Sequence, residues 1–184
     1  NFFFSPELLA TLSAPLFLTL KVSLVSALGF CFLGVPLAYW CARRESVLSK
    51  AVLFLATLPL IFPPIALGYL LMLLLGQQGF FGSWAMRVFD MRLLFSEGSV
   101  FLAGTIAGMP LVVRPIKEVL SSARLLALEE AASVLGVEGV KRFRLITLPL
   151  IKNTLLASIM MGVARASGEV GVTLMLGGNI ENRT

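Results

Sequence analysis

Long uncharged runs alternate with short charged connections along most of this chain, and this pattern predicts membrane-spanning helices. A helix needs about 20 predominantly apolar residues to cross the hydrocarbon core of a bilayer. The runs Val22 to Ala42 and Ala51 to Leu75 contain no charged residue. Gly98 to Val113 is a shorter candidate, and Leu148 to Leu176 is a fourth that includes charged residues. The pattern therefore predicts an all-α, polytopic membrane protein with four visible spans.

The segments between the spans carry turn and surface signals. Leu8 to Leu20 is expected to form an interfacial or outer helical piece before the first span, and Leu93 to Phe95 to lengthen the third. Gly76 to Gly79 predicts a turn out of the membrane. The mixed segment Phe80 to Glu97 predicts an amphipathic surface element. Pro115 to Arg144 is polar and strongly basic, which indicates a long connection in water.

Prolines interrupt the second run at Pro59, Pro63 and Pro64. A proline inside a helix frees a backbone carbonyl, and lipid offers that carbonyl no donor. We therefore expect this helix to bend or unwind where protein or a water-lined cavity surrounds it. Pro63 and Pro64 form either a hinge or unwound turn that lines a pathway, or a static kink.

The composition excludes an ordinary soluble domain. Of the 184 residues, 58% are hydrophobic and 14% are charged, against about 45–50% and about 25% in soluble domains. The sequence contains no histidine, and its two cysteines are Cys31 and Cys41. A His/Cys metal site therefore has no ligand set. We find no nucleophile–base pair, and we expect neither catalytic residues nor a metal site.

The basic residues divide unequally between alternate connections, which predicts the orientation in the membrane. The connections after the first and third spans hold Arg43, Arg44, Lys50, Arg114, Lys117, Arg124, Lys141, Arg142, Arg144 and Lys152, whereas the other two hold Arg87, Arg92 and Arg183. Cytoplasmic connections carry the excess of Lys and Arg, so we expect the N-terminus outside and both basic connections in the cytoplasm. We interpret the chain as a fragment whose fifth and last helix would follow Thr184. The net charge of +5 then reflects topology and not nucleic-acid binding.

The connection after the third span contains a short helical segment with small residues, Glu129-Glu130-Ala131-Ala132-Ser133-Val134-Leu135-Gly136. Gly136 is expected at the C′ position that ends this helix, and Pro149 suits the first turn of the helix that returns to the membrane. Ala131 and Ala132 would let another backbone approach closely. From composition alone, an interfacial helix held on anionic lipid by nearby basic residues is an equally open interpretation.

The spacing of these residues resembles the cytoplasmic signature of binding-protein-dependent ABC-importer permeases. In that signature Glu-Ala-Ala is followed after three residues by Gly, and after nine more by Ile-x-Leu-Pro. Its positions are filled here by Glu130, Ala131, Ala132, Gly136, Ile146, Leu148 and Pro149. The resemblance implies that the segment Glu129 to Gly136 docks on a separate ATP-binding subunit and transmits its motion. The chain contains no G-x-x-x-x-G-K-S/T phosphate loop, which agrees with a transport subunit that is not itself an enzyme.

Further segments resemble molybdate permeases of this family, from about Leu20 to the end of the chain. They are Leu58 to Pro64, Gly68 to Leu71, Gly79 to Gly82, Pro110 to Arg114, Ala164 to Gly171 and the residues from Asn179 to Thr184. The resemblance implies the type I ABC-importer transmembrane fold, with residues 1–184 as one truncated permease domain and 115–145 as its coupling segment. It also implies a homodimer in the inner membrane, ATP-binding subunits that hold ATP and Mg²⁺, and a periplasmic or extracellular oxyanion-binding protein. The permease would need no cofactor of its own.

Arg165 and Glu169 are a charged pair inside the fourth run, four residues apart and so on one helix face. Ionisable residues at membrane depth are costly and normally face protein or water. Three interpretations stay open. They are a salt bridge that holds the bundle or the dimer, an exposed interfacial pair, and a pathway or gate element with Ser167, Pro63 and Pro64 as further candidates. In the gate interpretation Arg165 helps an oxyanion pass, while Glu169 prevents it from being trapped.

We therefore expect an alternating-access importer for molybdate, with a sulfate or tungstate permease as the alternative within the class. An ion-gradient-driven secondary transporter or channel is the rival from another class, and it would leave the Glu-Ala-Ala spacing unexplained. The absence of histidine and of a catalytic cluster disfavours a membrane-bound enzyme.

Overall fold

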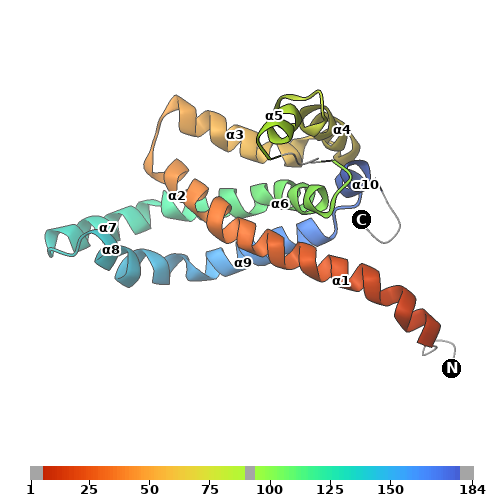
Figure 1. Ribbon diagram of the computed structural model, residues 1–184. Helices are drawn as coiled ribbons and strands as arrows, with labels where there is room; N and C mark the ends of the chain where they lie inside the picture. Colours follow the sequence, from red (N-terminus) through yellow and green to blue (C-terminus); the bar gives the residue numbers. More distant parts are fainter. Residues whose placement is uncertain (1–5, 90–93, 179–184) are drawn as a thin grey trace.

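The protein is a bundle of helices arranged around one long central helix (Figure 1). The computed structural model describes residues 6–89 and 94–178, and within these ranges the chain forms helices and no β-strand. The central helix is α6 (Glu97–Leu120), with α1 (Pro6–Gly29) and α9 (Leu148–Ser167) packed against it. The predicted all-α architecture is confirmed.

The first span is one continuous helical rod made of α1, a π-helical turn η2 (Phe30–Gly34) and α2 (Val35–Arg43). The segment Leu8 to Leu20 is helical as expected, but it continues directly into the span instead of forming a separate piece. Lys21 does not interrupt the rod, because its ammonium group lies over the Phe17 ring, 4.9 Å from the centroid. Cation–π attraction there compensates part of the lost hydration of the charge.

Two π-helical turns each come directly before a proline. In η2 the Val35 N–H donates to the Phe30 carbonyl, and Pro36 follows. The turn η3 (Phe143–Thr147) has the same arrangement before Pro149. Proline lacks an N–H, and its ring crowds the carbonyl four residues earlier, so a wider turn at this point lets the helix continue. Pro149 lies in the first turn of α9 as predicted, although the helical rod extends back through η3.

The second uncharged run is not one helix. It forms α3 (Val47–Ile61) and α4 (Pro64–Leu75), separated at Phe62 and Pro63. Phe62 is extended, with φ −79° and ψ 139°, because a residue before proline is driven out of the helical region. The predicted interruption is therefore confirmed, whereas an uninterrupted span over Ala51 to Leu75 is not formed.

A turn at residues 76–79 joins α4 to α5 (Phe80–Phe89), as the glycine-rich sequence predicted. The pair α4 and α5 is bent by 43° and together passes as one broken span or re-entrant loop. Three other helical stretches in the described residues are long and apolar enough to cross a membrane, namely Leu16–Arg43, Gly98–Leu120 and Gly139–Ser167. By length and composition the described residues therefore supply three spans, or four with the bent pair.

The third span extends in the opposite direction from the one expected. Helix α6 does not begin before Glu97, because Phe95 is in the left-handed region with φ 59° and its N–H donates to the Leu176 carbonyl at 2.8 Å. At its other end α6 continues through Pro115 to Leu120. The basic connection therefore starts after Leu120 and not at Pro115. The reason is burial: Leu120 is 1% exposed in the main core.

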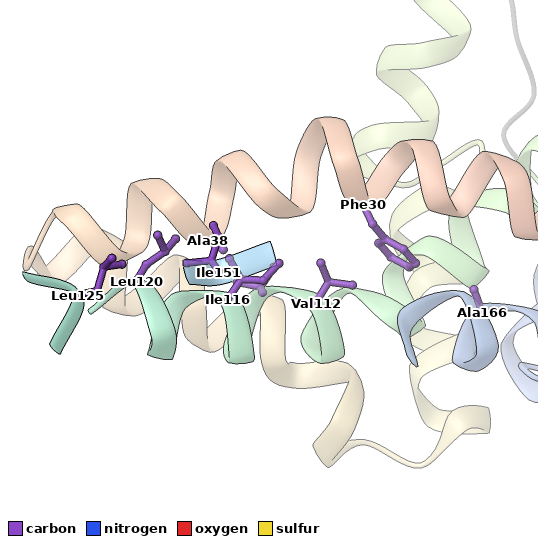
Figure 2. Packing of buried hydrophobic residues seen from close by; sticks show 9 residues of the cluster. Phe30, Ala38, Val112, Ile116, Leu120, Leu125, Ile151 and Ala166 are labelled. Carbon is purple, nitrogen blue, oxygen red and sulfur yellow. The ribbon is translucent and has the colours of Figure 1, made fainter. Parts of the chain in front are cut away.

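Two apolar clusters hold the bundle. The larger one lies in a row between the first span, α6 and α9 (Figure 2). It consists of Phe30, Ala38, Val112, Val113, Ile116, Leu120, Leu125, Ile151 and Ala166. The smaller cluster lies where α4 and α6 meet α10 (Gly171–Gly177), and consists of Leu67, Leu75, Ala103, Val172 and Leu176.

The fourth run also breaks. Helix α9 ends at Ser167, and α10 begins at Gly171, so the expectation of a single helix from Leu148 to Leu176 is wrong. Gly168 and the two residues after it take the chain around the break. In Figure 1, α10 lies at the opposite end of the bundle from α7 (Ala123–Val134) and α8 (Gly139–Arg142).

Candidate functional site

The segment with the Glu-Ala-Ala sequence forms the second half of α7. Its end has the hydrogen bonds of a Schellman motif: the Gly136 N–H donates to the Ser133 carbonyl at 3.0 Å, and the Val137 N–H to the Ala132 carbonyl at 2.9 Å. Gly136 has φ +77°, a conformation that L side chains rarely adopt. The predicted helix end at Gly136 is confirmed, and its backbone geometry requires a residue such as glycine.

Helix α7 has an inner face and an outer face. The inner face is buried at Leu125, Glu129 and Ala132, which are spaced at i, i+4 and i+7 and so follow one stripe of the helix. The outer face exposes Glu130 and Ala131. The sequence could not assign the two alanines to different faces, and only Ala131 offers its small side chain to another molecule.

The outer face continues into exposed apolar side chains at the end of the helix. Val134 is 83% exposed and Leu135 is 81% exposed, and Val140 on α8 is also exposed. None of these three belongs to the buried clusters. Exposed apolar side chains gathered next to small residues are typical of a surface that another protein covers.

The remaining signature residues lie around the start of α9. Ile146 is half-buried and packs against the larger cluster. Leu148 and Pro149 are exposed on the first turn of α9. Ile146 therefore anchors the start of α9 to the core. The accessible residues of the predicted coupling site are Glu130, Ala131, Gly136, Leu148 and Pro149.

Glu129 is the centre of a polar network on the inner face. One carboxylate oxygen, Oε1, accepts a hydrogen bond from Arg43 Nη2 at 2.6 Å and another from the Thr147 hydroxyl at 2.5 Å. The Glu129 side chain is 8% exposed and that of Arg43 is 25% exposed. The predicted docking residue Glu129 therefore turns inward to other parts of this chain.

A second arm of the network joins α7 to α8. The Arg142 Nη1 donates to the Ser133 hydroxyl at 2.6 Å, and that hydroxyl donates to the Glu129 carbonyl at 3.0 Å. Arg43 also lies over the Tyr39 ring, with Cζ 5.3 Å from the centroid. Arg43 and Arg142, which the sequence placed among the basic residues of the expected cytoplasmic connections, thus hold the coupling helix in place.

The environment of Glu129 shifts its acidity. Burial on its own would raise the pKa of the carboxyl group, but hydrogen bonds from Arg43 and Thr147 and the positive charges of Arg43 and Arg142 outweigh burial. The pKa of Glu129 therefore lies below its ordinary value. The carboxylate stays ionised at neutral pH.

A cavity of about 580 Å³ lies beside this network. Its walls are mainly apolar and come from the first span, α6, α8, η3 and the start of α9. The lining residues are Val35, Pro36, Tyr39, Leu120, Glu129, Gly139, Val140, Arg142, Phe143, Thr147 and Ile151. The cavity thus lies between α2 and η3, beside the edge-to-face contact of Tyr39 with Phe143, and Glu129 forms part of its wall.

The candidate gate residues gather around the break between α9 and α10. Arg165 Nη2 and Glu169 Oε2 are 2.8 Å apart, with side chains 36% and 2% exposed. The predicted pairing is confirmed, although Glu169 lies beyond the end of α9. Glu169 Oε1 accepts the Val172 N–H at 3.2 Å, so the same carboxylate also caps the first turn of α10.

Pro64 and Ser167, two further candidates, make contacts at this break. A Cβ atom added at Gly171 would lie 2.8 Å from the Pro64 Cβ, so the start of α4 packs directly on the start of α10. The Ser167 hydroxyl lies 2.8 Å from that of Ser23 in α1. Pro63 is exposed at the break before α4. The break between α3 and α4 therefore lies beside the break between α9 and α10.

The closest helix contact was missed from the sequence. Gly108 of α6 faces Gly162 of α9: a Cβ added at Gly108 would lie 2.5 Å from the Gly162 carbonyl oxygen and 2.5 Å from the Phe30 ring. Gly104 and Gly108 form a G-x-x-x-G pattern in an apolar helix, which is the available signal for such a contact. Gly34 and Gly68 also lie close to neighbouring side chains.

Apolar helices long enough to span a membrane, and a helix at one end of the bundle whose outer face exposes small and apolar side chains, are the features of a membrane-embedded transport subunit. Residues 34–183 match the family of binding-protein-dependent transport system inner membrane components, and the chain belongs to this family. The predicted class of multi-pass membrane permease is thereby confirmed.

Individual relatives extend this similarity over most of the chain. It is 34% identical over 167 residues to the molybdenum transport system permease protein ModB of Haemophilus influenzae, with 91% of this chain and 72% of that protein covered. The identity to ModB of Escherichia coli (strain K12) is 34% over 168 residues, with 91% and 72% covered. The sulfate transport system permease protein CysW of Synechococcus elongatus is 31% identical over 167 residues, with 91% and 58% covered.

Proposed function

We propose that this chain is the permease subunit of an ATP-driven ABC importer that moves molybdate into the cytoplasm by alternating access. Its partners are a separate ATP-binding subunit, which holds ATP and Mg²⁺, an extracytoplasmic oxyanion-binding protein and a second copy of the permease. The N-terminus lies outside and α7 lies in the cytoplasm. ATP binding closes the partner subunits, α7 moves with them, and the spans reopen toward the binding protein.

The observation that carries this proposal is the outer face of α7. A docking surface for a motor needs small or apolar side chains that are accessible, on an element outside the spans. Ala131 and Val134 meet this requirement next to the exposed Glu130, and Gly136 ends the helix. This surface lies at the same end of the bundle as the start of α3, where the other basic connection lies (Figure 1).

The docking role is tested by placing a larger side chain on the outer face of α7. We expect Ala131→Leu to abolish co-purification of the ATP-binding subunit, because the added side chain prevents close approach of the partner. Ala51→Leu is the matched control, since Ala51 is exposed on α3 at the same end of the bundle. Unchanged recovery of the ATP-binding subunit with Ala131→Leu would contradict the docking role.

The cargo assignment is supported by relatives whose names specify molybdenum, two of them at 34% identity with 72% of their length covered. The sulfate permease relative keeps sulfate as the second candidate. The test is ATP-dependent uptake of labelled molybdate by the reconstituted complex, with unlabelled tungstate and sulfate as competitors. Uptake that needs an ion gradient and no ATP-binding subunit would instead support a secondary transporter.

The pair Arg165 and Glu169 is proposed as a gate element at the break between α9 and α10. Arg165 is partly exposed while Glu169 is buried, so an oxyanion near the break meets a positive group whose charge Glu169 balances. Balanced charge favours passage, because a conducting site must also release its ion. Glu169→Gln is expected to lower molybdate uptake more than membrane insertion, whereas Glu138→Gln, exposed after α7, should change neither. Wild-type uptake in Glu169→Gln would remove the gate role and leave a structural salt bridge.

A further inference from the structure

One carboxylate of α7 contacts two of the spans. Glu129 Oε1 accepts hydrogen bonds from the Arg43 Nη2 at 2.6 Å and from the Thr147 hydroxyl at 2.5 Å. Arg43 is the last residue of α2, and Thr147 is the last residue of η3. Arg43 ends the first span, and Thr147 directly precedes α9. A single side-chain atom of the coupling helix therefore contacts the last residue of α2 and the residue that directly precedes α9.

The polar contact is accompanied by an aromatic one at this level, where the Tyr39 and Phe143 rings meet edge to face with their centroids 6.1 Å apart. The cavity of about 580 Å³ lies between α2 and η3, and Glu129 and Thr147 line it. On the inner face of α7, Leu125 belongs to the larger cluster one turn before Glu129. Packing thus fixes the first turns of α7, and in the second half, where Ala132 is also buried, the contact that joins α7 to the first span is the Glu129–Arg43 ion pair.

We propose that Arg43, Glu129 and Thr147 form an ionic latch through which movement of α7 is transmitted to the first span and to α9. Glu129 and Arg43 are positioning residues in this scheme, because they touch neither cargo nor nucleotide. The inference rests on the proposed function, in which α7 is moved by a partner, and adds the route by which that movement reaches the spans.

The geometry suits a contact that can be rearranged. Arg43 reaches Glu129 through Nη2, while its buried Nε has no hydrogen-bond partner among the described residues. The guanidinium is therefore held by Glu129 at Nη2 and by the Tyr39 ring at its face, while Nε is left unbonded within the described part of the chain. Removing either charge leaves the other without compensation in a largely buried site, so the latch is expected to fail when one partner is neutralised.

The test compares cargo moved with ATP hydrolysed, using labelled molybdate and the complete complex in proteoliposomes. We expect Glu129→Gln to hydrolyse ATP but to move about tenfold less molybdate per ATP, within the usual range of coupling between sites. Arg44→Gln is the matched control, because Arg44 is the exposed neighbour of Arg43, and should keep the wild-type ratio. An assembled Glu129→Gln complex with the wild-type ratio would overturn the latch.

A charge exchange guards against a variant that merely misfolds. Arg43→Glu and Glu129→Arg should each uncouple the complex, and the double variant should recover a substantial part of the transport ratio. A purely structural role would allow stability to recover without the ratio. No gain in the ratio for a double variant that assembles would likewise overturn the proposal.

Failure of the latch can be told apart from failure of the proposed function. If the wild-type complex takes up no molybdate, the cargo assignment fails, but hydrogen exchange of the isolated permease still reports on the latch. Amides of residues 127–134 should exchange several-fold faster in Glu129→Gln than in wild type or Arg44→Gln. Equal exchange in all three proteins would overturn the attachment of α7 through Glu129, whatever the cargo is.

Discussion

At the scale of single residues, the closest approach in the bundle is made possible by the absence of two side chains. Gly108 and Gly162 let α6 and α9 cross with backbone against backbone, and the Phe30 ring of η2 fills the space above the crossing. Association of helices in lipid depends on van der Waals contact and not on a hydrophobic driving force. The contact therefore depends on the fit of these three residues.

Gly108→Ala is expected to destabilise the purified permease by about 1–3 kcal/mol, the usual cost of overpacking. Its Cβ would lie 2.5 Å from the Gly162 carbonyl oxygen, and backbone cannot move aside as a side-chain tip can. Thermal unfolding in detergent measures the change. Gly98→Ala is the control, because its nearest neighbour, Ser96 Oγ, would lie at 3.5 Å; this variant should be neutral or slightly stabilised. Equal stability of the two variants would show that the helices do not cross at Gly108.

Glu129 gives the stability a predictable dependence on pH. Its pKa is lowered in the folded protein, so its stabilising effect is complete above the ordinary pKa of about 4.3 and is lost as the pH falls through the lowered pKa. The stability difference between wild type and Glu129→Gln should thus be constant near neutral pH and shrink in acid. Unfolding curves at several pH values measure this difference, and a difference that grows in acid would contradict the assigned ion pair with Arg43.

At the scale of helices, the sequence predicted which segments are apolar better than where each helix ends. The prolines at Pro63 and Pro64 predicted a break because proline acts locally on the backbone. The extension of α6 through Pro115 could not be predicted, because burial of Leu120 among other helices outweighs the local signal. The break after Ser167 was missed for a similar reason: it is stabilised by Glu169 bonds to Arg165 and to Val172.

The same reasoning explains which features of the coupling site could be predicted from the sequence. The Schellman end at Gly136 could be predicted because glycine supplies the required φ directly. The inward direction of Glu129 could not, because it depends on Arg43 and Thr147, which are 86 and 18 residues away in the chain. Only the fold brings these partners to one carboxylate.

The meeting of the two interrupted helices leads to a prediction at this scale. Gly171→Val would place its Cβ 2.8 Å from the Pro64 Cβ and force the start of α10 away from α4. We expect molybdate uptake to fall while the amount of permease in the membrane stays unchanged, because the spans themselves keep their apolar lengths. Leu174→Ala, on an exposed position of the same helix, serves as the control. Full uptake in Gly171→Val would show that transport does not depend on the contact between α4 and α10.

At the scale of the whole molecule, the two ends of the bundle differ in chemistry. One end carries α7, α8 and the junction of α2 with α3, where Arg43, Arg44 and Lys50 lie. The cytoplasmic side of a membrane retains the connections that are rich in Lys and Arg. Contact between Arg43 and Glu129 places two of the basic connections on the same side, as the proposed orientation requires.

The orientation can be measured by single-cysteine labelling after Cys31 and Cys41 are replaced by serine. The two positions to be labelled are Val134→Cys and Phe80→Cys. The native Val134 side chain is 83% exposed on α7 and that of Phe80 is 77% exposed on α5, so a thiol at either position would be accessible from water or the interface. An impermeant maleimide should label position 80 in intact cells and position 134 only in inverted vesicles, with the permease expressed alone so that no partner covers α7. The reverse pattern would place the outer face of α7 outside the cell, where no ATP-binding subunit can reach it. The small and apolar surface around Ala131 would then need an extracytoplasmic partner instead of a motor.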